Sequence, residues 1–164
     1  MSATREKGDS LTFKYARLLS VVDDGDYMVV TLQNPWKEGY TLHTYILIPR
    51  EAELPPHLPK GTVIRTPLQR AVIFTTVHSA LLMELGCQDQ IAGVADLKYI
   101  KIPWIHEQVA AGKITDCGDG MSPVIEKIID LHPDAILLSP FENSGGYGKL
   151  EDIDIPLVEC AEYM

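Results

Sequence analysis

The sequence has few cysteines, a shortage of basic residues and no long hydrophobic run. Its three cysteines, Cys87, Cys117 and Cys160, are scattered and form no CxxC pair, which excludes a disulfide framework. Fourteen Lys and Arg oppose 23 Asp and Glu. The resulting net charge of −9 argues against a nucleic-acid partner, because phosphate recognition requires a basic face.

No apolar run reaches the length of about 18 residues that a membrane span requires. Residues 1–10 contain no apolar segment of the kind found in signal peptides. The chain is therefore either cytoplasmic or the mature form of an exported protein.

The usual signatures of catalysis are also missing. The sequence contains no GxSxG or HExxH motif. Gly118 and Gly120 are followed by Pro123 where a dinucleotide-binding turn has its third glycine, and Leu150 stands where a P-loop has Ser or Thr. We therefore expect no enzyme activity, no cofactor and no metal, since none of the histidines has a partner at metal-ligand spacing: His43, His57, His78, His106 and His132.

The composition is that of a folded protein, with 46% hydrophobic and 23% charged residues in a chain of 164. Residues 1–12 predict a flexible polar tail, and residues 13–61 predict a small antiparallel β-rich segment. Within that segment Asp23–Asp26 is typical of a hairpin turn, and Thr41–Ile48 alternates in the pattern of a strand. The proline-rich stretch Glu51–Gly61 predicts an extended linker.

Short strands and helices alternate from Thr62 onward. Apolar and β-branched runs predict the strands, and runs with helical periodicity, closed by Gly86 and Gly112, predict helices between them. Strands that alternate with helices form a parallel sheet covered on both faces. We therefore expect residues 62–164 to form a three-layer αβα domain of the α/β class, with strands at 63–65, 71–74, 91–94, 135–138 and 157–159.

Residues 114–138 predict one complete turn–helix–strand unit of this sheet. Ser122 is a suitable N-cap, and Pro123 suits the first helical position because its missing N–H is not needed there. Pro133 ends the helix, since proline disfavours helical geometry in the residue before it. Ala135–Leu138 is fully apolar, as expected of a strand that is buried on both faces.

Ligands of an open α/β sheet bind outside the carboxyl ends of its strands. Four predicted loops lie at that edge, at residues 75–78, 95–104, 117–122 and 139–147. Their hydroxyl, imidazole, ammonium, amide and aromatic groups suit a polar or aromatic small ligand, although solvated loops explain the same polarity. The ligand-binding residues that we expect are Thr75, Thr76, His78, Lys98, Tyr99, Trp104, Asp119, Asn143 and Tyr147.

Several runs between Thr66 and Met164 form a distinctive series. They are Arg70–His78, Ile91–Val94, Asp116–Gly118 and Glu126–Leu138, of which the last is the most specific. In this order they resemble the N-terminal lobe of the class III periplasmic substrate-binding proteins that serve ABC importers of iron–siderophores, haem and vitamin B12.

The leading part of the chain extends the resemblance. Asn34-Pro35-Trp36 and Tyr45–Arg50 resemble the β-rich extension of members from Bacteroidetes-type bacteria. Members have two αβ lobes joined by a rigid helix, with the ligand held between the lobes. The resemblance therefore implies that the chain corresponds to one lobe, and that a linking helix and a second lobe would follow Met164.

This resemblance implies a non-catalytic solute-binding component of an ABC importer. It would bind an iron–siderophore, haem or corrinoid and deliver it to the membrane permease, and it would be periplasmic and lipid-anchored. In relatives a glutamate at the position of Glu126 docks into arginine pockets of the permease. An ordinary exposed glutamate near a helix N-terminus explains Glu126 equally simply.

Two other functions remain open from the sequence. A flavodoxin-like nucleotide-binding domain or small enzyme would need a phosphate-cradling turn, for which Gly118–Ser122 is the one candidate. A metal-binding lobe would depend on His78, which has no neighbouring ligand in the sequence.

Overall fold

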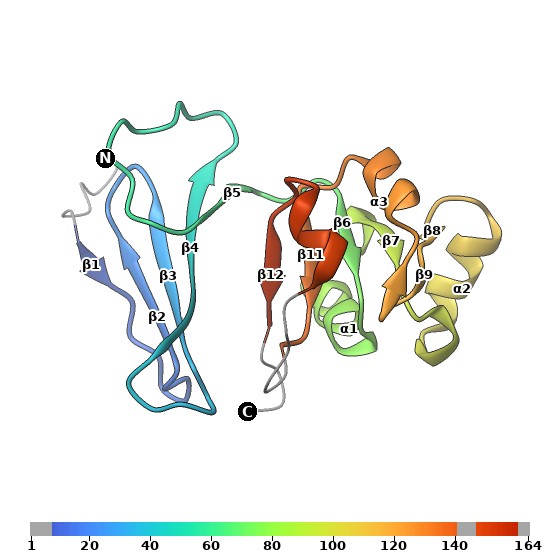
Figure 1. The fold of residues 1–164 in the computed structure, drawn as a ribbon, viewed down its shortest axis with the longest axis horizontal. Helices are drawn as coiled ribbons and strands as arrows, with labels where there is room; N and C mark the ends of the chain where they lie inside the picture. The colour runs from blue at the N-terminus through green and yellow to red at the C-terminus, as the bar shows by residue number, and fades with distance from the viewer. Residues whose placement is uncertain (1–7, 141–146, 161–164) are drawn as a thin grey trace. The chain divides into compact units, whose positions relative to one another are not determined.

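The computed structural model describes residues 8–140 and 147–160 of the chain (Figure 1). The chain forms two compact units, residues 1–67 and residues 68–164. No helix in the described ranges is both long enough and apolar enough to cross a bilayer.

The first unit is a five-stranded sheet in the order β1-β2-β3-β4-β5. Neighbouring strands are antiparallel except for β4 and β5, which are parallel. The antiparallel β-rich segment predicted for residues 13–61 is present, and one parallel strand is added to it. The strands are β1 (Asp9–Ser10), β2 (Leu19–Asp23), β3 (Met28–Gln33), β4 (Thr41–Pro49) and β5 (Thr62–Thr66).

The hairpin between β2 and β3 forms where the sequence predicts it. Gly25 has a φ of +88°, a backbone conformation that glycine adopts without steric penalty. Its N–H donates to Asp23 Oδ1 at 2.9 Å, so the aspartate stabilises the turn that follows it.

The unit boundary differs from the predicted one between residues 61 and 62. The run at residues 63–65 belongs to β5, which pairs with β4 in the first unit, so the units divide after Pro67. The guanidinium of Arg65 donates to the carbonyl oxygens of Pro49 and Ala52, which ties β5 to the end of β4. A short β-branched run fits either sheet equally well, and the sequence does not specify its partner.

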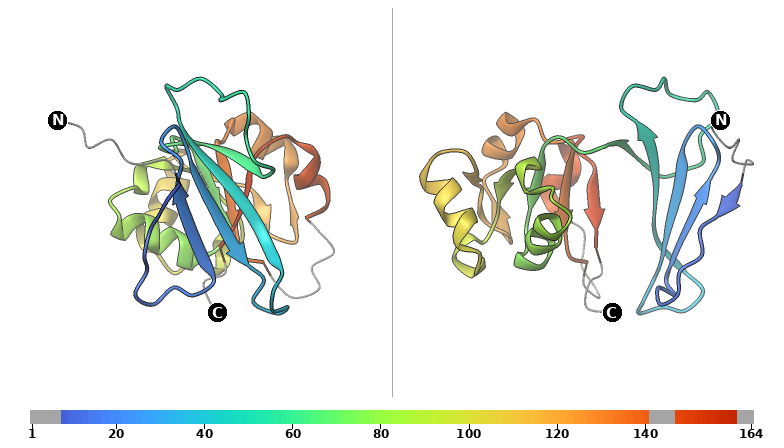
Figure 2. Two further views of the ribbon diagram at one scale, coloured as in Figure 1. Left: turned by 90° about the vertical axis from the view of Figure 1, so that its left-hand side faces the viewer. Right: turned by 180° about the vertical axis from the view of Figure 1, so that it is seen from behind.

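The second unit contains a parallel sheet in the order β12-β11-β6-β7-β8. Figure 2 shows this sheet and its helices from two further sides. Its strands are short and mostly buried on both faces, as their apolar sequences predict. They are β6 (Ala71–Ile73), β7 (Ile91–Val94), β8 (Thr115–Asp116), β11 (Ala135–Leu138) and β12 (Leu157–Glu159).

Helices cover both faces of this sheet, which confirms the predicted three-layer αβα fold. Helices α1 (Thr76–Glu84) and α2 (Pro103–Ala110) pack with a cluster that contains Ala71 and Ile73. Helix α3 (Ile125–Leu131) and the 3₁₀ helix η3 (Gly148–Asp152) pack on the opposite face with Val72, Ile128 and Ile136. The remaining short elements are η1 (Gln88–Gln90), η2 (Leu97–Tyr99), β9 (Gly118–Asp119) and β10 (Ser122–Pro123).

The start of α3 differs from the prediction. Ser122 and Pro123 are not the N-cap and first residue of the helix; they form β10, which pairs antiparallel with β9. The carboxylate of Asp119 accepts the N–H of Met121 at 2.8 Å, and this local hydrogen bond favours a tight hairpin over a helical turn. Helix α3 therefore begins at Ile125 without a side-chain cap, and Glu126 is its second residue.

The other helix boundaries follow the sequence signals. Thr75 caps α1, because its Oγ1 accepts the N–H of His78 at 3.2 Å. Gly86 follows α1 with a φ of +71°, as expected of a terminating glycine. His132 ends α3 immediately before Pro133, in agreement with the predicted stop.

Candidate functional site

The order of strands in the second unit creates one topological switch point. From β6 the chain moves through α1 to β7 on one side, whereas β11 lies on the other side of β6 and leads through η3 to β12. The two connections lie on opposite faces of the sheet. A crevice is therefore expected outside the carboxyl ends of β6 and β11.

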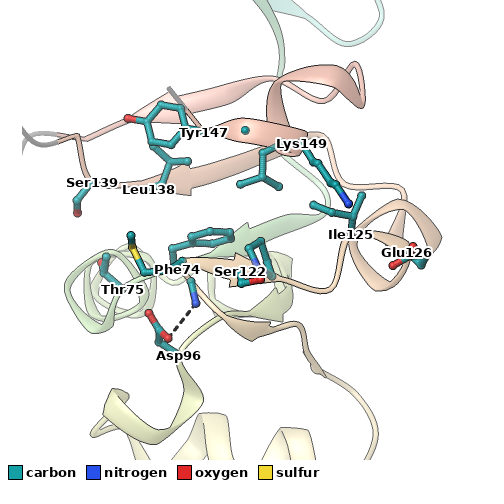
Figure 3. A pocket seen from close by; sticks show the side chains of 15 residues that line it. Phe74, Thr75, Asp96, Ser122, Ile125, Glu126, Leu138, Ser139, Tyr147 and Lys149 are labelled. Atoms are coloured by element: carbon teal, nitrogen blue, oxygen red, sulfur yellow. Dashed lines mark hydrogen bonds between the residues drawn. The ribbon is translucent and has the colours of Figure 1, made fainter. Parts of the chain in front are cut away.

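A cavity of about 590 Å³ occupies this position (Figure 3). Phe74 and Thr75, which follow β6, line it together with Leu138 and Ser139 at the end of β11. The other walls come from the second residue after β7, the β9–β10 hairpin, the start of α3, and η3 with the residue before it. These lining residues are Asp96, Gly120, Met121, Ser122, Pro123, Ile125, Glu126, Tyr147, Gly148, Lys149 and Leu150.

A hydrogen bond between Asp96 and Gly120 fixes the hairpin at the rim of the pocket. Asp96 has a left-handed backbone with a φ of +52°, and its Oδ1 accepts the N–H of Gly120 at 2.9 Å. The N–H of Asp96 in turn donates to the carbonyl of Gly118 at 2.8 Å. A Cβ added at Gly120 would lie 2.5 Å from Asp96 Oδ2, so any larger residue here would have to displace this carboxylate or the hairpin.

Two aromatic side chains, Phe74 and Tyr147, contribute to the apolar part of the lining. Tyr147 Oη donates to Glu159 Oε2 at 3.0 Å, and its backbone N–H donates to Glu151 Oε1 at the same distance. These bonds orient the ring from two directions. Phe74 is half-buried and packs with the cluster beneath α3. The pocket thus presents aromatic surface in fixed positions, as small-molecule sites commonly do.

The charged lining residues lie on two sides of the cavity. Figure 3 shows Asp96 near Thr75, whereas Glu126 and Lys149 lie on the side of Ile125. Asp96 is half-buried, and Glu126 and Lys149 are exposed. A bound molecule would therefore meet a carboxylate on either side and the ammonium of Lys149 on one.

Each of the four loops predicted at the sheet edge contributes to the pocket. Of the residues expected to bind ligand, Thr75 and Tyr147 line it. Glu126, which was expected to contact a permease, lines it as well. Asn143 lies outside the described residues.

The remaining predicted residues do not line the pocket. Thr76 Oγ1 donates to the carbonyl of Tyr99 at 3.1 Å, and the ammonium of Lys98 lies 4.9 Å from the centre of the exposed Tyr99 ring. Trp104 packs against the cluster beneath α1 and α2. Asp119 bonds its own hairpin, and His78 is buried with 2% of its surface exposed.

Sequence reasoning did not single out several lining residues. Asp96 is the second residue after β7, which is a position at the carboxyl edge of the sheet, and this placement was the available signal. Met121 and Ser122 were assigned to a loop and a cap rather than to a hairpin. Ser139 lies in a predicted loop but was not named, and Lys149 was expected to begin a short helix, Lys149–Ile153, rather than to bind ligand.

The β9–β10 hairpin does not form a phosphate cradle. Its backbone N–H groups at Gly118, Gly120 and Met121 donate to the carboxylates of Asp116, Asp96 and Asp119 at 2.8–2.9 Å. Amide groups that cradle a phosphate must instead point at the anion. The candidate nucleotide turn therefore has its donors already bonded to carboxylates.

Within the described residues, His78 does not belong to a group of side chains that could ligate a metal ion. Within residues 8–140 and 147–160, no group of three or more His, Cys, Asp or Glu side chains is arranged to hold a metal ion. His78 lies on the buried side of α1. Its position thus agrees with a role in packing the helix.

Cys117 is fully buried, and burial together with the nearby charge of Asp116 raises the pKa of its thiol from 9.0 to about 11. Since thiolate is the reactive form, at pH 8 only about 0.1% of Cys117 is reactive. We expect a maleimide or disulfide reagent to label Cys87 and Cys160, which are half-buried, before Cys117. Peptide mass mapping during a labelling time course measures this order.

Denaturant should remove the difference, because unfolding exposes all three thiols. Equal labelling rates in the folded protein would contradict the buried position of Cys117.

Because folding raises the pKa of the Cys117 thiol, the thiol contributes to stability below pH 9.0 and loses that contribution as the pH rises through about 11.

The chain is similar to known proteins over part of their length. No family model matches the chain. The chain is similar to an uncharacterised lipoprotein of Methanocaldococcus jannaschii, with 28% identity over 109 residues, which are 62% of this chain and 26% of that protein.

Two solved structures are also similar. The petrobactin-binding protein YclQ from Bacillus subtilis is 18% identical with a TM-score of 0.49, and the match covers 80% of this chain and 37% of that chain. SirA from Staphylococcus aureus, in complex with staphyloferrin B, is 24% identical with a TM-score of 0.44, covering 60% and 32% respectively. The matches thus span between 26% and 37% of the length of these proteins. Similarity at this level says nothing about the ligand of this chain.

Proposed function

We propose that the chain is a non-catalytic solute-binding component of an ABC importer. It binds an iron–siderophore, or a related haem or corrinoid, in the pocket of the second unit and delivers it to the membrane permease. The observation that supports this proposal is the cavity of about 590 Å³ at the switch point of the sheet, which is within the usual size range of small-molecule sites. Phe74 and Tyr147 offer aromatic surface there, and Thr75 offers a hydroxyl.

A binding role fits the lining better than a catalytic one. The described lining residues include the hydroxyls of Thr75, Ser122 and Ser139 but neither a histidine nor a cysteine. Nucleophilic catalysis by a hydroxyl uses an adjacent general base, which is most often a histidine. The alternative of a nucleotide-binding domain is disfavoured because the amide donors of the β9–β10 hairpin are bonded to carboxylates.

The proposed location is outside the inner membrane, with a lipid anchor in the full-length form. The relative from Methanocaldococcus jannaschii is described as a lipoprotein, which supports this location. The first unit is proposed to correspond to the β-rich extension of Bacteroidetes-type members, and its five-stranded sheet agrees with that assignment.

Calorimetric titration of the 164-residue chain tests the proposed function. The test ligands are ferric siderophores, haem and cyanocobalamin, with FMN and ATP as the competing class. Saturable binding of one metal-chelate class, lost in a Tyr147→Ala variant, is expected. Binding of FMN or ATP with no response to any chelate would instead favour the nucleotide-binding alternative.

Glu126 is proposed to dock into the permease. It is exposed near the start of α3 and also lines the pocket, so docking and ligand binding make different predictions for the same residue. We expect Glu126→Ala to reduce uptake several-fold in cells that depend on the importer, while the affinity for a neutral ferric chelate changes less than about twofold. Uptake of the radiolabelled ligand and calorimetry of the purified protein measure the two effects.

Glu107→Ala is the matched control for this variant. Glu107 is an exposed glutamate on α2 and is not a lining residue, so the substitution should leave uptake and affinity unchanged. A parallel loss of uptake and of affinity for the neutral chelate in Glu126→Ala would contradict docking and make Glu126 a direct ligand contact.

A further inference from the structure

The pocket carries more negative than positive charge. Among its described lining residues, the carboxylates of Asp96 and Glu126 oppose the single ammonium of Lys149. The formal charges of these described residues therefore sum to −1. The whole chain has the same sign, with a net charge of −9.

The hairpin that borders the pocket adds further carboxylates next to this negatively charged lining. Asp116 and Asp119 each direct a carboxylate oxygen to the hairpin backbone, and Lys127 contributes an ammonium that donates to the carbonyl of Asp116 at 3.2 Å. The amide groups of the hairpin are thus turned to these carboxylates. They are not positioned to hold an anionic ligand.

We infer that the ligand of this pocket is a neutral or cationic ferric chelate of the tris-hydroxamate type, and that trianionic tris-catecholates are disfavoured. The inference rests on the proposed function and specifies its ligand class. Three hydroxamates, each with one negative charge, neutralise Fe³⁺, whereas three catecholate dianions leave a charge of 3−. A trianion needs several cations around it, and here it would meet Lys149 together with the carboxylates of Asp96 and Glu126.

The uncharged part of the lining suits the same class. Hydroxamate chelates expose carbonyl and amide groups and aliphatic spacers. Hydroxyl side chains such as Thr75 and Ser122 can hydrogen-bond to the carbonyl and amide groups. The rings of Phe74 and Tyr147 can pack against the aliphatic spacers. A ligand that carries an ammonium group would gain further from the carboxylate of Glu126 at the rim.

A series of chelates that differ mainly in charge tests this inference. Ferrioxamine B is cationic, its N-acetyl derivative is neutral and its N-succinyl derivative is anionic, while the tris-hydroxamate centre is the same in all three. We expect affinity to fall in that order, by about tenfold or more from the cation to the anion at low salt. Ferric enterobactin, a tris-catecholate trianion, should bind more weakly than ferrioxamine B, and 0.5 M salt should reduce the differences.

Charge-neutralising variants connect the preference to the pocket. Glu126→Gln should reduce the ratio of cation to anion affinity by a few-fold, and Lys149→Gln should increase it by a similar factor. Glu107→Gln removes an exposed charge on α2 and should leave the ratio unchanged.

The outcomes separate the inference from the function on which it rests. Binding of ferric enterobactin as tight as or tighter than that of ferrioxamine B overturns the inference and leaves the proposed function intact. Absence of saturable binding by all four chelates overturns the inference, and absence of haem and cyanocobalamin binding as well overturns the proposed function. An affinity order that follows the charge series and responds to the two lining variants supports both.

Discussion

Ile136→Ala is expected to lower the free energy of unfolding of the second unit by about 2–5 kcal/mol. Ile136 lies in the middle of β11, with none of its surface exposed, and packs in one cluster with Val72 and Ile128. Strand β11 is hydrogen-bonded to β6 on one side and to β12 on the other, so the backbone cannot close around the space that the shortened side chain leaves. The loss of unfolding free energy therefore includes the transfer free energy of the removed atoms and the cost of the cavity that they leave.

Urea denaturation in a Trp36→Phe background measures this effect, because Trp104 of the second unit then remains as the single tryptophan. Ile129→Ala is the matched control. It removes the same atoms from α3, where 44% of the Ile129 surface is exposed, and should change the unfolding free energy by less than about 1 kcal/mol. Equal losses in the two variants would contradict the described core.

Gly120→Val is expected to weaken ligand binding more than about tenfold, or about 1.4 kcal/mol. A Cβ at this position would lie 2.5 Å from Asp96 Oδ2 and 3.2 Å from Asp96 Cγ, so the valine side chain must displace the carboxylate or the hairpin. Displacement breaks the hydrogen bond from the Gly120 N–H to Asp96 Oδ1 and shifts the hairpin and Asp96, which belong to two walls of the pocket.

Met121→Ala is the control, because Met121 belongs to the same hairpin but has 85% of its surface exposed. Its effect on affinity should stay below about threefold. Calorimetric titration measures both affinities, and thermal unfolding verifies that Gly120→Val remains folded. Unchanged affinity in a folded Gly120→Val variant would show that the ligand binds elsewhere.

The sequence predicted the layers of the second unit because its signals there are local. Apolar runs such as Ala135–Leu138 are long enough for buried strands. Gly86 and Pro133 mark the ends of α1 and α3. Such signals act within a few residues of the backbone that they control. They do not specify which sheet a short strand joins, and this is why Thr62–Thr66 was assigned to the wrong side of the unit boundary.

The candidate site was predictable in position but only partly in residues. The carboxyl edge of a parallel sheet follows from the order of strands and helices, so the four loops at that edge could be named. Which side chains turn inward depends on backbone details. Asp96 enters the pocket from a left-handed backbone, and the helix that begins after Thr75 turns His78 into the core.

A paramagnetic NMR experiment tests most directly whether the pocket of the second unit binds a metal chelate. The ¹⁵N-labelled chain is titrated with a ferric chelate that binds it by calorimetry, and the corresponding gallium complex serves as the diamagnetic reference. The strongest broadening is expected at the amides of Thr75, Gly120 and Ser139. Less is expected at Gly86, which follows α1, and at Ala135, which is the first residue of β11. Strongest broadening at residues away from the pocket, or no specific broadening at all, would contradict the account.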